Sequence, residues 1–174
     1  MVPFSSATPS EFTWSKLPRS RGYELKLHGA IVGTLRRTKL WSSNYQATTS
    51  DGTFAFRRSC WGTKVEIVNS TSGQQIALFQ SGWRKRSMLT FKDGQRLYID
   101  RKGCWRPQWR VFNESGQPVL SLYQRERLAD NSGATELEQS RQSLLILLIL
   151  YRIRQAEEEA ASATVAIAAV IASS

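Results

Sequence analysis

The sequence predicts a mainly β protein: a closed antiparallel barrel of about ten to twelve strands wrapped round one hydrophobic C-terminal α-helix. Three observations predict this fold. Small glycine turns recur through the chain, apolar and polar residues alternate between them, and an apolar run of helical character follows the last turn. The chain has 174 residues, of which 41% are hydrophobic and 22% charged, a composition typical of one globular domain.

Five glycine turns set the rhythm of the strands. Their glycines are Gly29, Gly52, Gly73, Gly94 and Gly116, at spacings of 23, 21, 21 and 22 residues. Asp-Gly and Ser-Gly between apolar runs indicate hairpins, because glycine adopts the positive φ that tight turns require. Each interval has room for two strands of about six residues and a second loop. We therefore expect five hairpins, about ten strands, between Tyr23 and Gln124.

The residues on either side of these turns alternate with a period of two, which is typical of strands with one buried face. Leu89 and Phe91 precede the fourth turn, and Leu97 and Ile99 follow it. These four residues are expected to face one another across a hairpin. An additional edge strand is expected within residues 12–20, which contain Phe12 and Trp14.

The hydrophobic period changes after the last hairpin. Residues 125–134 are expected to form a linker, and Thr135 with Glu138 fits a capping box at the start of a helix over about 135–158. Residues 144–151 read LLILLILY, which is apolar on every helical face. Such a helix must be buried on all sides, and a barrel of more than about eight strands leaves room for it. The run is too short to span a membrane, which needs roughly 20 apolar residues.

The expected organisation is an N-terminal tail over residues 1–11, the barrel with its helix over 12–158, and an Ala-rich segment over 159–174. This last segment is expected to be either a loose tail or a second helix. The N-terminus lacks an apolar run of signal-peptide length, and two cysteines do not make a disulfide framework. We therefore expect a cytoplasmic, thiol-reduced, monomeric protein that is not secreted.

The sequence offers little catalytic chemistry. It contains one histidine, His28, and two cysteines, Cys60 and Cys104. His28 precedes a turn glycine and is expected to be exposed, while the cysteines are expected to be small buried apolar groups. The acidic run Glu157–Glu159 is expected to lie on a solvated helix surface, with an Arg154–Glu158 pair, and not to bind metal. We expect a non-enzymatic protein without cofactor or metal.

The chain is strongly basic, with 24 Lys and Arg against 14 Asp and Glu and a net charge of +10. Alternate loops of a meander lie at opposite barrel ends. The glycine turns mark one end, here named the turn rim. The other end, here named the basic rim, carries the loops that contain Trp41, Trp61, Trp83 and Trp105. The candidate residues for binding an anionic ligand at the basic rim are Arg36, Arg37, Arg57, Arg58, Arg84, Lys85, Arg86, Arg101, Lys102, Arg106, Trp83 and Trp105.

Several interpretations of the basic rim stay open. Arginine, lysine and tryptophan together suit an anionic membrane surface, where indole rings lie at headgroup depth. The same residues could grip the phosphates of nucleic acid and stack on its bases. The charge could instead be a solvated face of a structural or protein-interaction module, with the tryptophans filling one barrel end. One member of each adjacent arginine pair is expected to pair with Asp100 or Glu66.

The hairpin meander with its glycine turns, followed by the Leu144–Tyr151 segment, resembles the tubby C-terminal-like superfamily. The nearest branch is the LURP-one-related and phospholipid scramblase-like one, including its small bacterial members. The resemblance covers roughly residues 23–153 and carries no individual ligand residue over. It implies a twelve-stranded barrel around a buried helix, and it implies binding of anionic lipid, phosphoinositide headgroups among them. Binding of anionic lipid by the basic rim is therefore the leading hypothesis.

Overall fold

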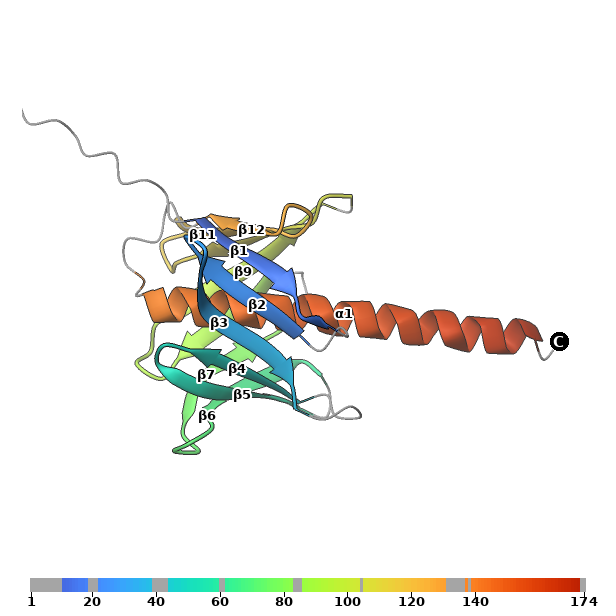
Figure 1. The fold of residues 1–174 in the computed structure, drawn as a ribbon, viewed down its shortest axis with the longest axis horizontal. Coiled ribbons are helices and arrows are strands. Elements are labelled where there is room, and N and C mark those ends of the chain that lie inside the picture. The colour runs from blue at the N-terminus through green and yellow to red at the C-terminus, as the bar shows by residue number, and fades with distance from the viewer. Residues whose placement is uncertain are drawn as a thin grey trace, which may run out of the picture.

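The computed structural model describes residues 11–18, 22–38, 44–59, 62–82, 86–103, 105–130, 137 and 139–172. Twelve antiparallel strands close into a barrel around one helix, so the expected fold class is confirmed. Figure 1 shows the helix running through the ring of strands and continuing beyond it. The strands are β1 (Glu11–Lys16), β2 (Gly22–Leu27), β3 (Ala30–Arg37), β4 (Tyr45–Thr49), β5 (Gly52–Arg58), β6 (Lys64–Asn69), β7 (Gln75–Gln80), β8 (Arg86–Phe91), β9 (Arg96–Lys102), β10 (Gln108–Phe112), β11 (Pro118–Tyr123) and β12 (Leu128–Asp130).

The five expected hairpins are present as the ten strands β2 to β11. Each strand pairs with the next one in sequence, and Leu89 lies opposite Leu97 as expected. Each turn contains a glycine with positive φ, for example Gly94 at φ 91°. His28 also has positive φ, at 49°, and is exposed. Local turn chemistry therefore sets most of this topology.

Barrel closure differs from the expectation in two places. The strand at the N-terminus, β1, is not an edge, because it pairs with β2 on one side and with β12 on the other. Strand β12 lies inside the expected linker of residues 125–134 and also pairs with β11. These two short strands remove both edges of the sheet, which would otherwise expose unpaired backbone groups.

The helix α1 (Gln139–Ala172) is longer than expected. It does not end near residue 158, and the Ala-rich segment continues it instead of forming a loose tail or a second helix. Alanine has the highest helix propensity, and the sequence there has no Gly or Pro to end the helix. The expected capping residues Thr135 and Glu138 lie outside the described residues.

The apolar run of α1 occupies the barrel interior. None of the side chains from Leu144 to Tyr151 is more than 5% exposed. The inward faces of the strands surround them, and the rings of Tyr45 and Phe56 each lie 5.3 Å from the Tyr151 ring in edge-to-face contact. The expected enclosure of this segment is confirmed.

The two ends of α1 meet different rims. At the turn rim, Arg141 donates hydrogen bonds to Asp93 at 2.6 Å and to Gln95 at 2.8 Å, both in the turn between β8 and β9. The helix then leaves the barrel at the basic rim (Figure 1). In the described part of the chain, no helix has the length and apolar character needed to cross a bilayer.

Candidate functional site: the basic rim and the exit of α1

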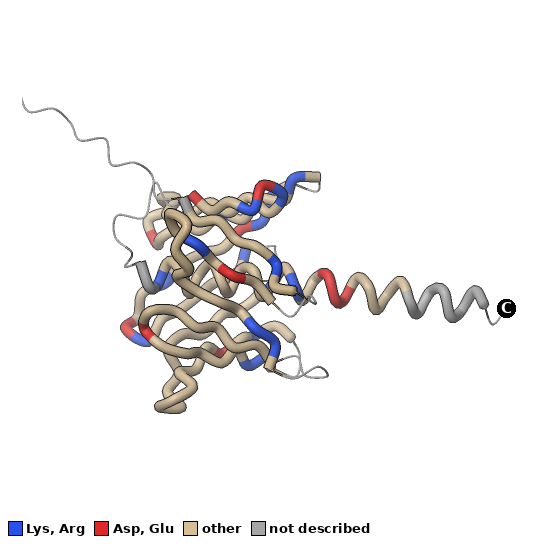
Figure 2. Tube along the Cα trace, in the orientation of Figure 1, with Lys and Arg blue, Asp and Glu red and all other residues tan. Residues whose placement is uncertain are grey.

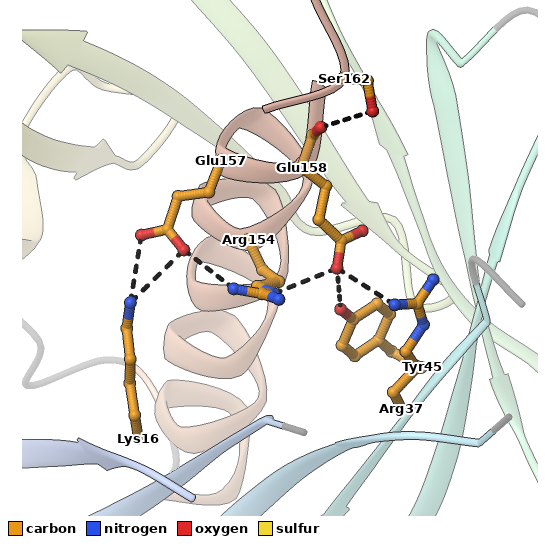
Figure 3. A network of polar contacts seen from close by, with 7 residues as sticks. All are labelled: Lys16, Arg37, Tyr45, Arg154, Glu157, Glu158 and Ser162. Atoms are coloured by element: carbon orange, nitrogen blue, oxygen red, sulfur yellow. Dashed lines mark hydrogen bonds and ion pairs between the residues drawn. The ribbon is translucent and has the colours of Figure 1, made fainter. Parts of the chain in front are cut away.

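Three consecutive glutamates mark the point where α1 leaves the barrel. Glu157, Glu158 and Glu159, here named the carboxylate collar, contact cations on the ends of surrounding strands. Figure 3 shows the contacts of Glu157 and Glu158. Figure 2 shows this acidic band on α1 beside basic strand ends. The collar was expected to be a solvated helix surface. Glu159 is exposed as expected, but Glu157 and Glu158 are only partly exposed, because the helix exits between strands that carry arginine and lysine.

Glu157 bridges the first strand and the helix. Its carboxylate accepts hydrogen bonds from Lys16 Nζ at 3.5 Å and from Arg154 Nη1 at 3.3 Å. Both contacts are partly exposed, so each contributes about 0–1 kcal/mol to stability.

One carboxylate oxygen of Glu158 contacts three donor groups. Its Oε1 accepts hydrogen bonds from the Tyr45 hydroxyl at 2.9 Å and from Arg154 Nε at 3.1 Å, and Arg37 Nη1 lies 3.5 Å away. Burial raises the pKa of Tyr45, and the hydrogen bond to Glu158 raises it further. The phenol therefore stays protonated and donates to the carboxylate. The expected Arg154–Glu158 pair is confirmed.

Glu159 pairs with Arg58 Nη2 at 2.7 Å. One member of each adjacent arginine pair was expected to pair with Asp100 or Glu66 on the sheet, but Arg37 and Arg58 have partners on α1 instead. Of the two expected partners, Asp100 lies 3.7 Å from Arg110, and Glu66 lies opposite Arg57 in the β5–β6 ladder. The basic rim thus has an inner ring of cations whose charge the collar offsets.

An outer group of cations has no such partner. Arg36, Arg57, Arg101, Lys102 and Arg106 are exposed, and none forms an ion pair with a carboxylate of the described residues. Arg101 lies over the Trp109 ring at 5.8 Å. The charges of these cations are exposed to solvent and can attract an anionic surface.

Trp105 lies among these cations and is 94% exposed. The expectation that the loop tryptophans fill the barrel end is wrong for this residue, because α1 already occupies that space. Trp105 lies in a tight loop between β9 and β10. The loop requires glycine at position 103, because φ is 80° there and a Cβ atom would lie 2.7 Å from the Arg106 carbonyl oxygen. Trp41, Trp61, Trp83, Arg84, Lys85, Cys60 and Cys104 lie outside the described residues.

Arg86 does not belong to the rim loops. Its guanidinium lies over the rings of Tyr98 at 5.1 Å and Phe112 at 5.8 Å, on the outer wall formed by β8, β9 and β10. In this position the exposed guanidinium packs against aromatic faces.

The structure adds three cations that the sequence analysis did not select: Lys16 at the end of β1, and Arg125 and Arg127 in the loop between β11 and β12. They surround a cleft of about 190 Å³ at the basic rim, here named the seam cleft because the first and last strands meet there. Its lining residues are Trp14, Lys16, Tyr23, Gln124, Arg125, Arg127, Leu150, Ile153 and Glu157. Extending the alternation of loop ends past the fifth hairpin would have placed residues 124–127 at this rim.

A larger cleft of about 530 Å³ lies at the turn rim, between α1 and the strand ends near Phe54, Ile76 and Phe91. Of the four charged residues that line it, Arg141 bonds Asp93 and lowers the pKa of that carboxyl, while Asp51 and Lys92 form no ion pair with a described residue. Within the described ranges, no three His, Cys, Asp or Glu side chains are grouped to hold a metal ion.

Comparisons of the chain with protein-family models, curated proteins and solved structures find no match.

Proposed function

We propose that the protein binds anionic membrane lipid, without catalysis, through its basic rim. One observation carries this proposal: Trp105 is almost fully exposed between the exposed cations Arg101, Lys102 and Arg106, at the end of the barrel from which α1 emerges. A large exposed indole is unfavourable in water and favourable at the depth of lipid headgroups.

The charges around Trp105 supply the electrostatic part of binding. A lysine or arginine near an anionic leaflet contributes about 1 kcal/mol, and the contribution weakens as salt screens it. The collar carboxylates would repel the same surface, but Lys16, Arg37 and Arg58 offset their charge. The rim therefore presents net positive charge around the helix exit.

The emerging part of α1 supplies the apolar part. Residues 160–172 contain no charged side chain, and Ala160–Thr164 are exposed. Their two hydroxyls bond within the helix: Ser162 Oγ donates to the Glu158 carbonyl at 2.9 Å and Thr164 Oγ1 to the Ala160 carbonyl at 3.0 Å. Polar groups satisfied in this way tolerate an apolar environment. At 1.5 Å per residue these positions extend about 20 Å, which reaches into a bilayer core of about 30 Å without crossing it.

Membership of the tubby C-terminal-like superfamily, near its LURP-one-related and scramblase-like branch, is part of this proposal, as is a peripheral, cytoplasmic location. The closed barrel and the enclosed helix support that membership.

Vesicle co-sedimentation tests the proposal. The protein should bind vesicles of phosphatidylcholine with phosphatidylserine, should bind pure phosphatidylcholine much less, and should dissociate as salt rises. Lys102→Ala/Arg106→Ala should weaken binding roughly tenfold or more, since two rim charges are lost. The matched control is Lys92→Ala/Arg96→Ala, which removes the same charges from the turn rim and should bind as the wild type does.

Absence of binding to the anionic vesicles at low salt would contradict the proposal, and so would an equal loss in both double variants. Binding of a single-stranded oligonucleotide that is stronger than vesicle binding and equally sensitive to Lys102→Ala/Arg106→Ala would replace membrane lipid with nucleic acid.

A further inference from the structure

We propose that the seam cleft is a binding site for a single phosphate group, free or as a phosphomonoester. This inference rests on the proposed function and deepens it, because a lipid headgroup at the basic rim is one source of such a phosphate. The cleft opens where β1, β2, the β11–β12 loop and α1 meet, so the two ends of the strand order and the helix all contribute side chains.

The charges that line the seam cleft favour an anion. Lys16, Arg125 and Arg127 give three positive charges against the one negative charge of Glu157, a difference of +2. Glu157 already accepts from Lys16 and Arg154. Arg125 and Arg127 are exposed, and neither forms an ion pair with a carboxylate in the described part of the chain. Two guanidinium groups are thus available, and guanidinium matches the geometry of phosphate oxygens.

A buried donor without a partner supports the same conclusion independently. Tyr23 lines the cleft and is only 3% exposed, and its hydroxyl has no hydrogen-bond partner among the described residues. Burial and then the charge of Glu157 raise the pKa of Tyr23 to about 12, while Arg154 and Arg127 oppose the rise. The phenol is therefore protonated and its hydroxyl lies near the charged groups of the cleft. Buried hydroxyls in proteins are nearly always paired, so one without a partner in a cleft that Arg125 and Arg127 also line indicates a ligand.

The backbone holds Arg127 in place. Its φ of 55° is unusual for a residue other than glycine, and strained positions of this kind concentrate at ligand-binding sites. The Trp14 amide donates to the Arg127 carbonyl at 3.2 Å, and the Gln124 amide donates to the Pro107 carbonyl at 3.2 Å. Both ends of the loop are thereby hydrogen-bonded to neighbouring backbone, which anchors the backbone of Arg127 beside the cleft.

The size of the cleft limits the ligand. About 190 Å³ accommodates a phosphate and a few further atoms, and the apolar lining of Trp14, Leu150 and Ile153 suits a short aliphatic portion beside it. Glycerol phosphate, as found in phosphatidic acid, has this chemistry, and so does inorganic phosphate.

Titration of the full chain with inorganic phosphate, at constant ionic strength in chloride, tests the site by thermal unfolding and by calorimetry. Phosphate should raise the unfolding temperature of the wild type. Tyr23→Phe and Arg127→Asn should each weaken phosphate binding by roughly tenfold. Asparagine is chosen because it tolerates positive φ, so the loop keeps its conformation. Arg96→Asn, the same change at the turn rim, should bind phosphate as the wild type does.

A second readout separates a ligand role from a structural one. Without phosphate, Tyr23→Phe should unfold at the same temperature as the wild type or a higher one, because the removed hydroxyl has no partner to lose. A variant that is as stable as the wild type and yet binds phosphate less tightly is the expected result. Equal phosphate binding by the wild type, Tyr23→Phe and Arg127→Asn would overturn the inference, and so would the lack of any phosphate effect on the wild type.

Vesicles separate the two sources of phosphate and keep this inference distinct from the proposed function. If the headgroup is the source, vesicles with phosphatidic acid should lose affinity for Arg127→Asn more than vesicles with phosphatidylserine at equal surface charge. Phosphate binding that depends on Tyr23 and Arg127 in a protein that binds no vesicle would support the site and end the membrane function. Normal vesicle binding, together with phosphate binding that depends on neither residue, would support the membrane function and contradict the phosphate site.

Discussion

At the residue scale, the close approach of α1 to the barrel wall depends on Gly33. This glycine lies within β3 and faces the helix, where an added Cβ would lie 3.1 Å from Leu147 Cδ1 and 3.4 Å from the Thr48 carbonyl oxygen. A separation of 3.1 Å is shorter than ordinary contact, so any larger side chain must displace the leucine. Interiors are packed as tightly as organic crystals and accommodate such displacement poorly.

Gly33→Val should lower the free energy of unfolding by about 1–3 kcal/mol, because it overpacks the contact with Leu147. Leu147→Ala alone should lower it by about 2–5 kcal/mol, because it leaves a cavity. The double variant should be more stable than the sum of the two changes predicts, since the valine fills part of that cavity. Urea unfolding of all four proteins measures this coupling. Strict additivity would show that β3 and α1 do not pack in this way.

At the element scale, α1 is attached to the barrel at both ends and is apolar between them. Arg141 joins it to the turn rim, and the carboxylate collar joins it to β1, β3, β4 and β5 at the basic rim. Two buried tyrosines beside the collar make this arrangement sensitive to alkali. Burial is the main cause that raises the pKa of Tyr23, and of Tyr151 on α1, from 10.0 to about 12.

Stability should therefore fall between pH 10 and pH 12. Below pH 10 both tyrosines are neutral in the folded and unfolded chains, and their contribution is complete. Above it the unfolded chain ionises first, which costs roughly 2 kcal/mol per tyrosine by pH 12. Urea unfolding at a series of pH values measures the slope, and Tyr23→Phe should reduce it. An unchanged slope in Tyr23→Phe, equal to that of the control Tyr123→Phe, would contradict the buried titration.

Most of the strands and the enclosed part of the helix could be predicted from the sequence alone. Hairpins β2 to β11 follow from local glycine turns and a period of two. The enclosure of residues 144–151 follows from a helix that is apolar on every face and therefore has to be surrounded by the strands. Strand β12 was missed because three residues, Leu128–Asp130, are too few to show a period. The end of α1 was misplaced because the three glutamates resemble a helix end, although they continue into a strong helix-forming sequence.

The candidate site was predictable only in part, for a physical reason. The sequence indicates which loops share a rim, so Arg101, Lys102 and Arg106 were selected correctly as exposed basic-rim cations. The sequence does not reveal how deep α1 lies in the barrel or how it is rotated there. These two quantities determine that Arg37 and Arg58 form ion pairs with the collar. The seam cleft was missed for a different reason: it forms where β12 pairs with β1, and β12 was not predicted.

At the scale of the whole molecule, the two barrel ends are chemically different. The turn rim has tight glycine turns and the Arg141–Asp93 ion pair that joins α1 to it. The basic rim has an exposed indole, unpaired cations, the seam cleft and the emerging apolar helix. A molecule of this polarity should approach an anionic bilayer basic rim first, with α1 directed toward the lipid and the turn rim facing away.

Hydrogen–deuterium exchange with and without phosphatidylserine vesicles tests this orientation and the enclosure of α1 together. Amides of residues 144–151 should exchange slowly in both conditions, because the barrel must open before they meet water. On addition of vesicles, residues 105–106, 124–127 and 160–172 should gain protection, and the five glycine turns should not. Rapid exchange of residues 144–151 in the free protein would contradict the enclosed helix. Vesicle protection confined to the glycine turns would contradict the proposed membrane face.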